Sequence, residues 1–242
     1  DTPGGRGDEV AEAVAAARAA DAVVMVMGLS SRLEGEEMPV RIEGFAGGDR
    51  SNLDLPKLQQ QLMEKVVEAA KGKPVVLVLL NGSALSIGWA DQNVPAIVEA
   101  WYGGQAAGTA VGEVLFGDVS PAGRLPLTFY RSLDQLPPFD DYAMKGRTYR
   151  YFTGAPLYPF GHGLSYSRFS YAKLRVPKQA AVGAPVEVSA EVRNVGTRPA
   201  DEVVQLYVSD QQASAPVPIR ALKGFERVTL RPGEKRVVRF RL

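Results

Sequence analysis

Three glutamates stand close together in the segment Leu33-Glu34-Gly35-Glu36-Glu37-Met38. Carboxylates at this spacing repel one another, so shielding the segment from water would raise the pKa of at least one of them. A carboxyl group that stays protonated near neutral pH is what general-acid catalysis requires. The spacing alone also fits a solvated acidic loop, which is the more common situation. Both interpretations stay open at this point.

The position of these glutamates along the chain favours a functional loop. They lie within residues 29–52, a stretch rich in glycine and charge that directly follows an apolar run, Ala22 to Gly28, expected to be a strand. Connections between strand and helix are usually about 2–6 residues long, and much longer ones are mostly functional or disordered. Open α/β sheets bind ligands at the carboxyl ends of their strands. We therefore expect this loop to face a ligand.

Other segments offer weaker indications of a site. Asp49 and Arg50 are expected to pin the loop through a local ion pair or turn, and the alternative is that Arg50 touches a ligand. The segment 101–105, Trp-Tyr-Gly-Gly-Gln, ends a strand and opens a helix whose free N–H groups could face a ligand. It lacks the remaining glycines of a dinucleotide fingerprint, so no cofactor is expected. Asn81-Gly82-Ser83 is interpreted as a turn, and Trp89 as a packing residue.

Composition excludes several classes of site. The 242 residues contain no cysteine and one histidine, so disulfides are impossible and we expect no metal site. The formal net charge is +1, and no basic run interleaves with aromatic residues, so nucleic acid is not an expected partner. The longest apolar run, Pro74 to Leu80, is too short to cross a bilayer, so no membrane partner is expected either. His162 lies between two glycines, and without a Gly-x-Ser-x-Gly elbow a Ser-His hydrolase is not expected.

Strands and helices alternate in the first half of the chain, which predicts a mostly parallel sheet between helices. The apolar run at residues 74–80 has no polar face, so it predicts a strand buried on both sides. The second predicted helix starts at Asp54 and Pro56 and buries Leu58, Leu62, Val66 and Ala70. The other predicted elements are a helix at 9–19 capped by Asp8, a strand at 94–101, a helix at 105–116 and a strand at 125–130.

The pattern changes after Tyr166 to short alternating segments separated by turns, as in residues 186–193 and 203–208. This predicts an all-β sandwich of the fibronectin or immunoglobulin type, of which one or two closing strands are missing. We thus divide the chain into an α/β sandwich domain at 1–132, an aromatic and proline-rich linker at 133–165 and a β-sandwich at 166–242. Both ends are expected to be cut from a longer polypeptide.

Several motifs resemble those of family 3 glycoside hydrolases, in the order in which that family carries them. The resemblance covers nearly the whole chain, and its most specific part is the run Leu157-Tyr-Pro-Phe-Gly-His-Gly-Leu-Ser-Tyr. The other motifs are Leu33-Glu-Gly-Glu-Glu-Met with Gly47-Gly-Asp-Arg, Pro74-Val-Val-Leu-Val-Leu-Leu-Asn-Gly, Glu99-Ala-Trp-Tyr-Gly-Gly-Gln, Leu115-Phe-Gly-Asp-Val-Ser-Pro-Ala-Gly-Arg-Leu-Pro and Tyr149-Arg-Tyr-Phe.

The resemblance implies the second domain and the fibronectin type III-like domain of a retaining, exo-acting β-glycosidase that removes β-linked xylose or glucose from oligosaccharides. It implies that Glu36 is the general acid/base, with Glu34 and Glu37 as alternatives, and that Asp49 and Arg50 support the loop or the substrate. The nucleophile would be an aspartate of an amino-terminal (β/α)8-type barrel, and therefore not a residue of this chain. The competing hypothesis is a non-catalytic carbohydrate-binding or structural pair of domains. The family also implies a periplasmic or secreted location.

Overall fold

A computed structural model describes residues 7–242, which form two compact units. The first unit contains residues up to 108 together with 129–138 and 155–157, and the second contains 109–128, 139–154 and 158–242. No helix among the described residues is long and apolar enough to cross a membrane. The predicted domain boundaries at 132 and 165 stay a prediction.

A three-stranded parallel sheet forms the centre of the first unit. Its strands are β1 (Val23–Gly28), β4 (Val75–Leu80) and β5 (Ala96–Glu99), in the order β1-β4-β5. The central strand β4 pairs with both neighbours, Val23 aligning with Val75 and Val76 with Ala96. Leu77, Val78 and Leu79 are almost completely buried. The predicted α/β class and the doubly covered strand at 74–80 are thus confirmed.

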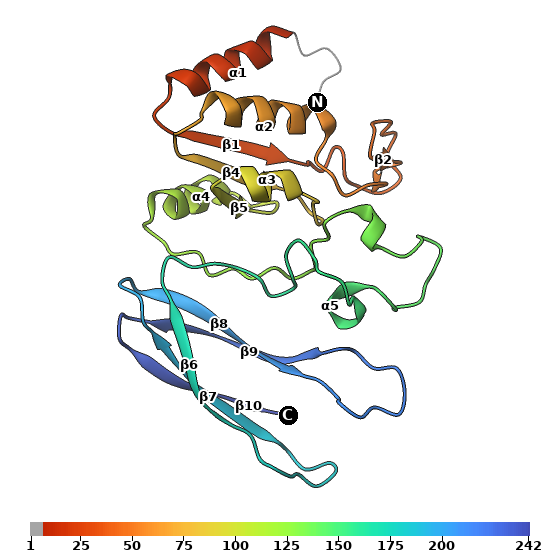
Figure 1. The fold of residues 1–242 in the computed structure, drawn as a ribbon, viewed down its shortest axis with the longest axis vertical. Helices are drawn as coiled ribbons and strands as arrows, with labels where there is room; N and C mark the ends of the chain where they lie inside the picture. The colour runs from red at the N-terminus through yellow and green to blue at the C-terminus, as the bar shows by residue number, and fades with distance from the viewer. Residues whose placement is uncertain (1–6) are drawn as a thin grey trace. The chain divides into compact units, whose positions relative to one another are not determined.

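Helices α1 (Gly7–Ala19) and α2 (Lys57–Ala69) lie side by side on one face of this sheet (Figure 1). The expected buried stripe of α2 was partly wrong. Leu58 is 64% exposed, whereas Met63 is fully buried together with Val66 and Ala70. The helix is rotated from the predicted orientation because the bulky Met63 fills the core next to Val66. The capping role predicted for Asp8 lies outside the described side chains.

Two further elements correct the sequence-based expectations. The predicted strand at 94–101 is shorter, because a helix α3 (Gly88–Asn93) precedes it and Val94 still closes that helix. Helix α4 (Ala107–Phe116) agrees with the prediction for 105–116. The strand predicted at 125–130 was wrong, since only Phe129 forms an isolated bridge. Pro126 has no N–H to donate, and Leu125 hydrogen-bonds with the turn at residues 161–162 instead.

The carboxyl-terminal part of the second unit, residues 169–241, is a two-layered β-sandwich. One sheet contains β6 (Phe169–Arg175), β7 (Glu187–Asn194) and β10 (Lys235–Arg241), and the other pairs β8 (Ala200–Val208) with β9 (Ala221–Leu230). All pairings are antiparallel. Both sheets contribute to one apolar core, which consists of Val192, Val204, Val228, Leu230 and Val238. The predicted all-β class is confirmed, although β6 was not predicted, because nearly all of its residues are exposed.

The remaining helical segments are short. A 3-10 turn covers Leu133–Gln135 in the first unit, and α5 (Thr148–Tyr151) belongs to the second. The sequence 133–154 contains no long periodic pattern, so neither segment was predicted. Tyr149 of α5 stacks on Phe160 with ring centroids 4.2 Å apart.

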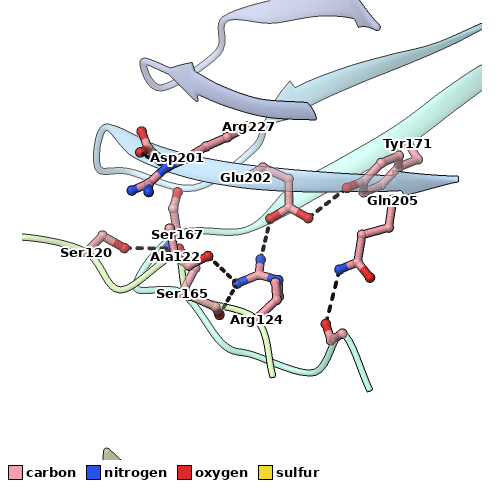
Figure 2. A network of polar contacts seen from close by, with 12 residues as sticks. Ser120, Ala122, Arg124, Ser165, Ser167, Tyr171, Asp201, Glu202, Gln205 and Arg227 are labelled. Carbon is pink, nitrogen blue, oxygen red and sulfur yellow. Dashed lines mark hydrogen bonds and ion pairs between the residues drawn. The ribbon is translucent and has the colours of Figure 1, made fainter. Parts of the chain in front are cut away.

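A polar network holds irregular segments of the second unit to strand β8 (Figure 2). Arg124 forms an ion pair of 2.8 Å with Glu202, and their side chains are only 12% and 13% exposed. The hydroxyl of Tyr171 donates to the other oxygen of Glu202 at 2.7 Å, and burial followed by this bond raises the pKa of Tyr171. Gln205 donates to the carbonyl of Gly161. These contacts fix segments that carry little regular structure of their own.

Replacing Arg124 with alanine should destabilise the second unit strongly, because Glu202 would keep a largely buried charge without its cationic partner. We expect the free energy of unfolding to fall by about 3 kcal/mol. Urea denaturation followed by circular dichroism measures this change. The matched control is Arg227→Ala, since Arg227 pairs with Asp201 at 2.6 Å but is itself 65% exposed. That variant should lose about 1 kcal/mol or less. Equal losses in the two variants would contradict the interpretation.

Candidate active site

The carboxyl ends of the three parallel strands lie at one edge of the first unit's sheet. Strand β1 leads into the loop 29–52, β4 leads into Asn81-Gly82-Ser83, and β5 leads into Trp101 and Tyr102. Because the strands are parallel, these three segments meet although they are far apart in the sequence. Ligand sites of open α/β sheets lie at this edge.

Gly28 lets the chain leave the sheet at this edge. Its φ is +133°, and a Cβ atom placed there would lie 2.0 Å from the carbonyl oxygen of Leu80. The side-chain amide of Gln59 on α2 hydrogen-bonds to both the N–H and the carbonyl of Gly28, each at 2.8 Å. Only glycine fits this close approach of two strands. The start of the long loop is therefore fixed to both the sheet and α2.

The loop 29–52 is ordered by contacts within itself. The sequence predicted an irregular stretch, and the structure contains a small hairpin formed by β2 (Phe45–Ala46) and β3 (Asp49–Arg50). The turn of this hairpin accepts two hydrogen bonds from the acidic segment, one from Gly35 N–H to Gly48 at 3.2 Å and one from Met38 N–H to Gly47 at 2.7 Å. The backbone on both sides of residues 36 and 37 is therefore held.

Glu34 is the residue that connects the loop to the other two strand ends. One carboxylate oxygen accepts a hydrogen bond from the hydroxyl of Ser83. The other accepts from the N–H of Gly82 at 3.3 Å and from the hydroxyl of Tyr102 at 3.0 Å. Burial, followed by the hydrogen bond to Glu34 and its charge, raises the pKa of Tyr102 to about 12. This set of contacts among Glu34, Gly82, Ser83 and Tyr102 is called the Glu34 anchor below.

Arg50 reinforces the same anchor from the hairpin. Its guanidinium donates to the hydroxyl of Ser83 at 3.0 Å and to the backbone carbonyls of Asn52 and Asp54 at 3.1 and 3.2 Å. Burial lowers the pKa of Arg50, and the nearby charge of Glu34 opposes that shift. These contacts agree with the pinning interpretation. A direct role for Asp49 or Arg50 toward a substrate stays a prediction.

Glu36 and Glu37 differ from Glu34 in their surroundings. Both side chains are exposed, and among the described residues neither has a hydrogen-bonding partner or an ion pair. Glu37 adopts a left-handed backbone conformation with φ +49°. The three carboxylates therefore differ in role, because Glu34 is held by Ser83 and Tyr102 while the other two side chains are exposed and make no such contacts. The catalytic assignment of Glu36 stays a prediction.

Glu99 is a second carboxylate at this edge that the sequence reasoning missed. It ends β5 and lies mostly buried, where it accepts from the side-chain N–H of Asn81 at 3.3 Å and from the backbone N–H of Trp101 at 3.2 Å. Burial raises the pKa of Glu99 to about 7, and these two hydrogen bonds partly oppose the shift. The signal in the sequence was a single acidic residue at the end of the apolar run Ala96-Ile97-Val98.

A cleft of about 490 Å³ lies beside the start of α2 in the same unit. Its lining combines the indole of Trp89 with polar and charged side chains, among them Glu43, Asp54, Lys57, Gln60 and Arg131. Trp89 is partly exposed, so the indole is not entirely used in packing. His162 belongs to the second unit, and its ring stacks on Tyr158 with centroids 5.1 Å apart.

Comparison with known families identifies the chain. The model of the glycosyl hydrolase family 3 C-terminal domain matches residues 6–166, and that of the fibronectin type III-like domain matches residues 202–242. The chain belongs to the glycosyl hydrolase family 3 C-terminal domains. This glycosyl hydrolase family 3 C-terminal domain carries the long loop, the Glu34 anchor and Glu99, all within the matched residues. The resemblance inferred from the motifs is therefore confirmed.

Individual relatives agree with this family. The chain is 45% identical to a xylan 1,4-beta-xylosidase of Xylanibacter ruminicola and 40% identical to a periplasmic beta-glucosidase of Salmonella typhimurium. These alignments cover 96% and 95% of this chain but 26% and 31% of the relatives. A crystal structure of a Bifidobacterium adolescentis GH3 beta-glucosidase superposes with a TM-score of 0.86 at 34% identity, covering 100% of this chain and 36% of that one. The chain thus spans about a quarter to a third of the length of its relatives.

The buried carboxyl group of Glu99 should make the stability of this glycosyl hydrolase family 3 C-terminal domain depend on pH. Its pKa in the folded state is about 7 against an ordinary value of 4.5, so the folded state holds a proton that the unfolded state has released. Stability therefore falls as pH rises from 4.5 to 7, by about 3 kcal/mol for a shift of this size. Glutamine cannot ionise, so Glu99→Gln should be the more stable protein at pH 8.

Urea denaturation at pH 5 and pH 8 measures this effect. The advantage of Glu99→Gln over the original protein should be large at pH 8 and small at pH 5. The control is Glu68→Gln, since Glu68 is exposed on α2 and its replacement should have the same effect at both pH values. An advantage of Glu99→Gln that does not change with pH would contradict the assignment of the titrating group.

Proposed function

We propose that this chain is the carboxyl-terminal part of a retaining, exo-acting β-glycosidase that hydrolyses terminal β-linked xylose or glucose from oligosaccharides. The names of its relatives support this substrate class, since two relatives at 45% and 44% identity are β-xylosidases and a third at 40% is a β-glucosidase. For this reason we propose xylose as the sugar that the complete enzyme releases. An amino-terminal (β/α)8-type barrel of the same protein supplies the nucleophilic aspartate and holds most of the sugar.

In this proposal Glu36 is the general acid/base. The observation that carries it is the contrast within one loop: the Glu34 anchor and the Gly35 and Met38 hydrogen bonds fix the backbone, while Glu36 is left exposed at the ligand-binding edge of the sheet. A proton donor that serves a neighbouring domain has to be rigidly placed and free of partners in its own domain. Glu34 uses both of its oxygens in hydrogen bonds, so it suits the structural role better.

The reaction is a double displacement. The barrel aspartate attacks the anomeric carbon while Glu36 gives its proton to the glycosidic oxygen, so that bond breaks and the alcohol leaves. The glutamate, now ionised, takes a proton from water, which attacks the same carbon and releases the sugar and the aspartate. Retention of configuration requires the two carboxyl groups to lie about 5–5.5 Å apart. No cofactor takes part in these steps.

Replacing Glu36 with alanine in the complete enzyme should lower turnover about 10²–10⁴-fold, the usual contribution of general acid–base catalysis. Added azide should restore part of the rate with an activated aryl glycoside, because azide needs no general base. Steady-state rates with and without azide measure both effects. Glu37→Ala is the matched control, since Glu37 is the exposed neighbour and should retain most of the activity. Wild-type rates in Glu36→Ala would rule out this assignment.

The 242-residue chain alone should hydrolyse no aryl glycoside, because the nucleophile belongs to the barrel. Turnover by the purified chain would contradict this division of the active site.

The competing function is carbohydrate binding without catalysis, and the cleft lined by Trp89 and Arg131 favours it. Our proposal expects no binding of xylotriose to the isolated chain at millimolar concentration, because the barrel holds the sugar. Isothermal titration calorimetry tests this expectation. Binding that is lost in Trp89→Ala, together with full activity of Glu36→Gln in the complete enzyme, would establish the competing function instead.

A further inference from the structure

A short chain of hydrogen bonds joins the buried Glu99 to the Glu34 anchor. The side-chain nitrogen of Asn81 donates both to Glu99 at 3.3 Å and to the backbone carbonyl of Ser83 at 2.9 Å. The hydroxyl of Ser83 in turn donates to Glu34 and accepts from Arg50. These hydrogen bonds connect the carboxyl ends of β5, β4 and β1, so a change of charge at one strand end can affect the contacts at the other two.

We propose that Glu99 is a positioning residue, which acts through Asn81 and Ser83 on the Glu34 anchor and so controls the placement of the loop 29–52. The inference rests on the proposed function, because placement of this loop matters for turnover if Glu36 delivers the proton. It adds a residue that touches neither the sugar nor the reacting atoms.

Asn81 is the residue whose side-chain amide can adopt two orientations. Its side chain is completely buried, and its amide oxygen has no hydrogen-bonding partner among the described residues. With Glu99 ionised, both donors of the amide are used and only the oxygen is unpaired. A protonated Glu99 offers an O–H group that this oxygen can accept after the amide rotates. Rotation withdraws the nitrogen from Ser83, so protonation of Glu99 competes with the Asn81–Ser83 bond.

Several other ionisable groups lie around Glu99 at this edge. They are Glu34, Arg50 and Asp54 on the long loop and its exit, Tyr102 after β5, and Tyr130 in the segment whose carbonyl accepts from Ser86. The pKa of Tyr102 is about 12, so its proton stays in place near neutral pH. The pKa of Glu99 is about 7, so this carboxyl changes charge in the neutral range. The Glu34 anchor therefore responds to pH through a group outside it.

The test uses nuclear magnetic resonance of the 242-residue chain and needs no catalysis. In the original protein the backbone amide signals of Gly82 and Ser83 should move with pH, with a midpoint near 7 that matches the carboxyl carbon signal of Glu99. In Glu99→Gln this movement should disappear. In Asn81→Ala the Glu99 signal should still titrate, while the Ser83 signal should no longer follow it. Glu68→Gln is the control and should leave all of these titrations unchanged.

Two outcomes would overturn the proposal. One is a flat Ser83 signal around pH 7 in the original protein, and the other is an unchanged Ser83 titration in Glu99→Gln. The test uses two variants, because Glu99→Gln and Asn81→Ala interrupt the connection from Glu99 to Ser83 at different points.

The result is independent of the Glu36 assignment. If Glu36→Ala leaves the complete enzyme fully active, the proposed function fails. The pH titration of the Ser83 signal still tests the connection from Glu99 through Asn81 to Ser83. In the complete enzyme Glu99→Gln should change the pH dependence of kcat/KM near pH 7. Glu36→Ala should lower kcat/KM at every pH instead.

Discussion

Much of the first unit serves to hold one long loop at the end of β1. Fixing the backbone of a residue costs roughly 1–2 kcal/mol, and the loop has no regular core of its own to offset that cost. The hydrogen bonds of Glu34 to Ser83, Gly82 and Tyr102 provide the compensation, because bonds to a charged group contribute more than neutral ones. Arg50 adds three more contacts from the hairpin. Removing this anchor would leave the middle of the loop without its hydrogen bonds to the segments that follow β4 and β5.

The sequence predicted the architecture of this unit well where the apolar pattern was strong. The run at residues 74–80 is apolar throughout and became the central strand, as expected of a strand buried on both faces. The long loop at residues 29–52, which follows the neighbouring strand β1, was predicted to be functional because of its unusual length. What failed depended on three-dimensional packing: Leu58 fits the helical stripe, but Met63 occupies the core. The strand expected at 125–130 failed because Pro126 cannot donate to a sheet.

The site was predicted only in part, for a related reason. Spacing placed Glu34, Glu36 and Glu37 together as one acidic group, yet the hydrogen-bonding partners that separate them come from β4 and β5, about fifty and seventy positions away. Glu99 was missed because its burial and its bond to Asn81 have no local pattern. The family was identified from the resemblance of several motifs. This resemblance does not depend on predicting contacts between residues far apart in the sequence. In the second unit the buried side-chain amide of Asn194, at the end of β7, is likewise hydrogen-bonded to distant segments, including Ser167 and Leu230.

The separation of roles between Glu34 and the tip of its loop has a consequence for engineering. The tip, Gly35 to Met38, is joined to the hairpin through backbone atoms, and its two acidic side chains make no contact that folding requires. Position 36 can therefore accept other side chains without disturbing the loop, whereas position 37 is restricted to residues that tolerate its left-handed backbone. A library limited to positions 36 and 37 would vary the two exposed carboxylates of the loop while the Glu34 anchor and the two backbone hydrogen bonds keep the loop in place.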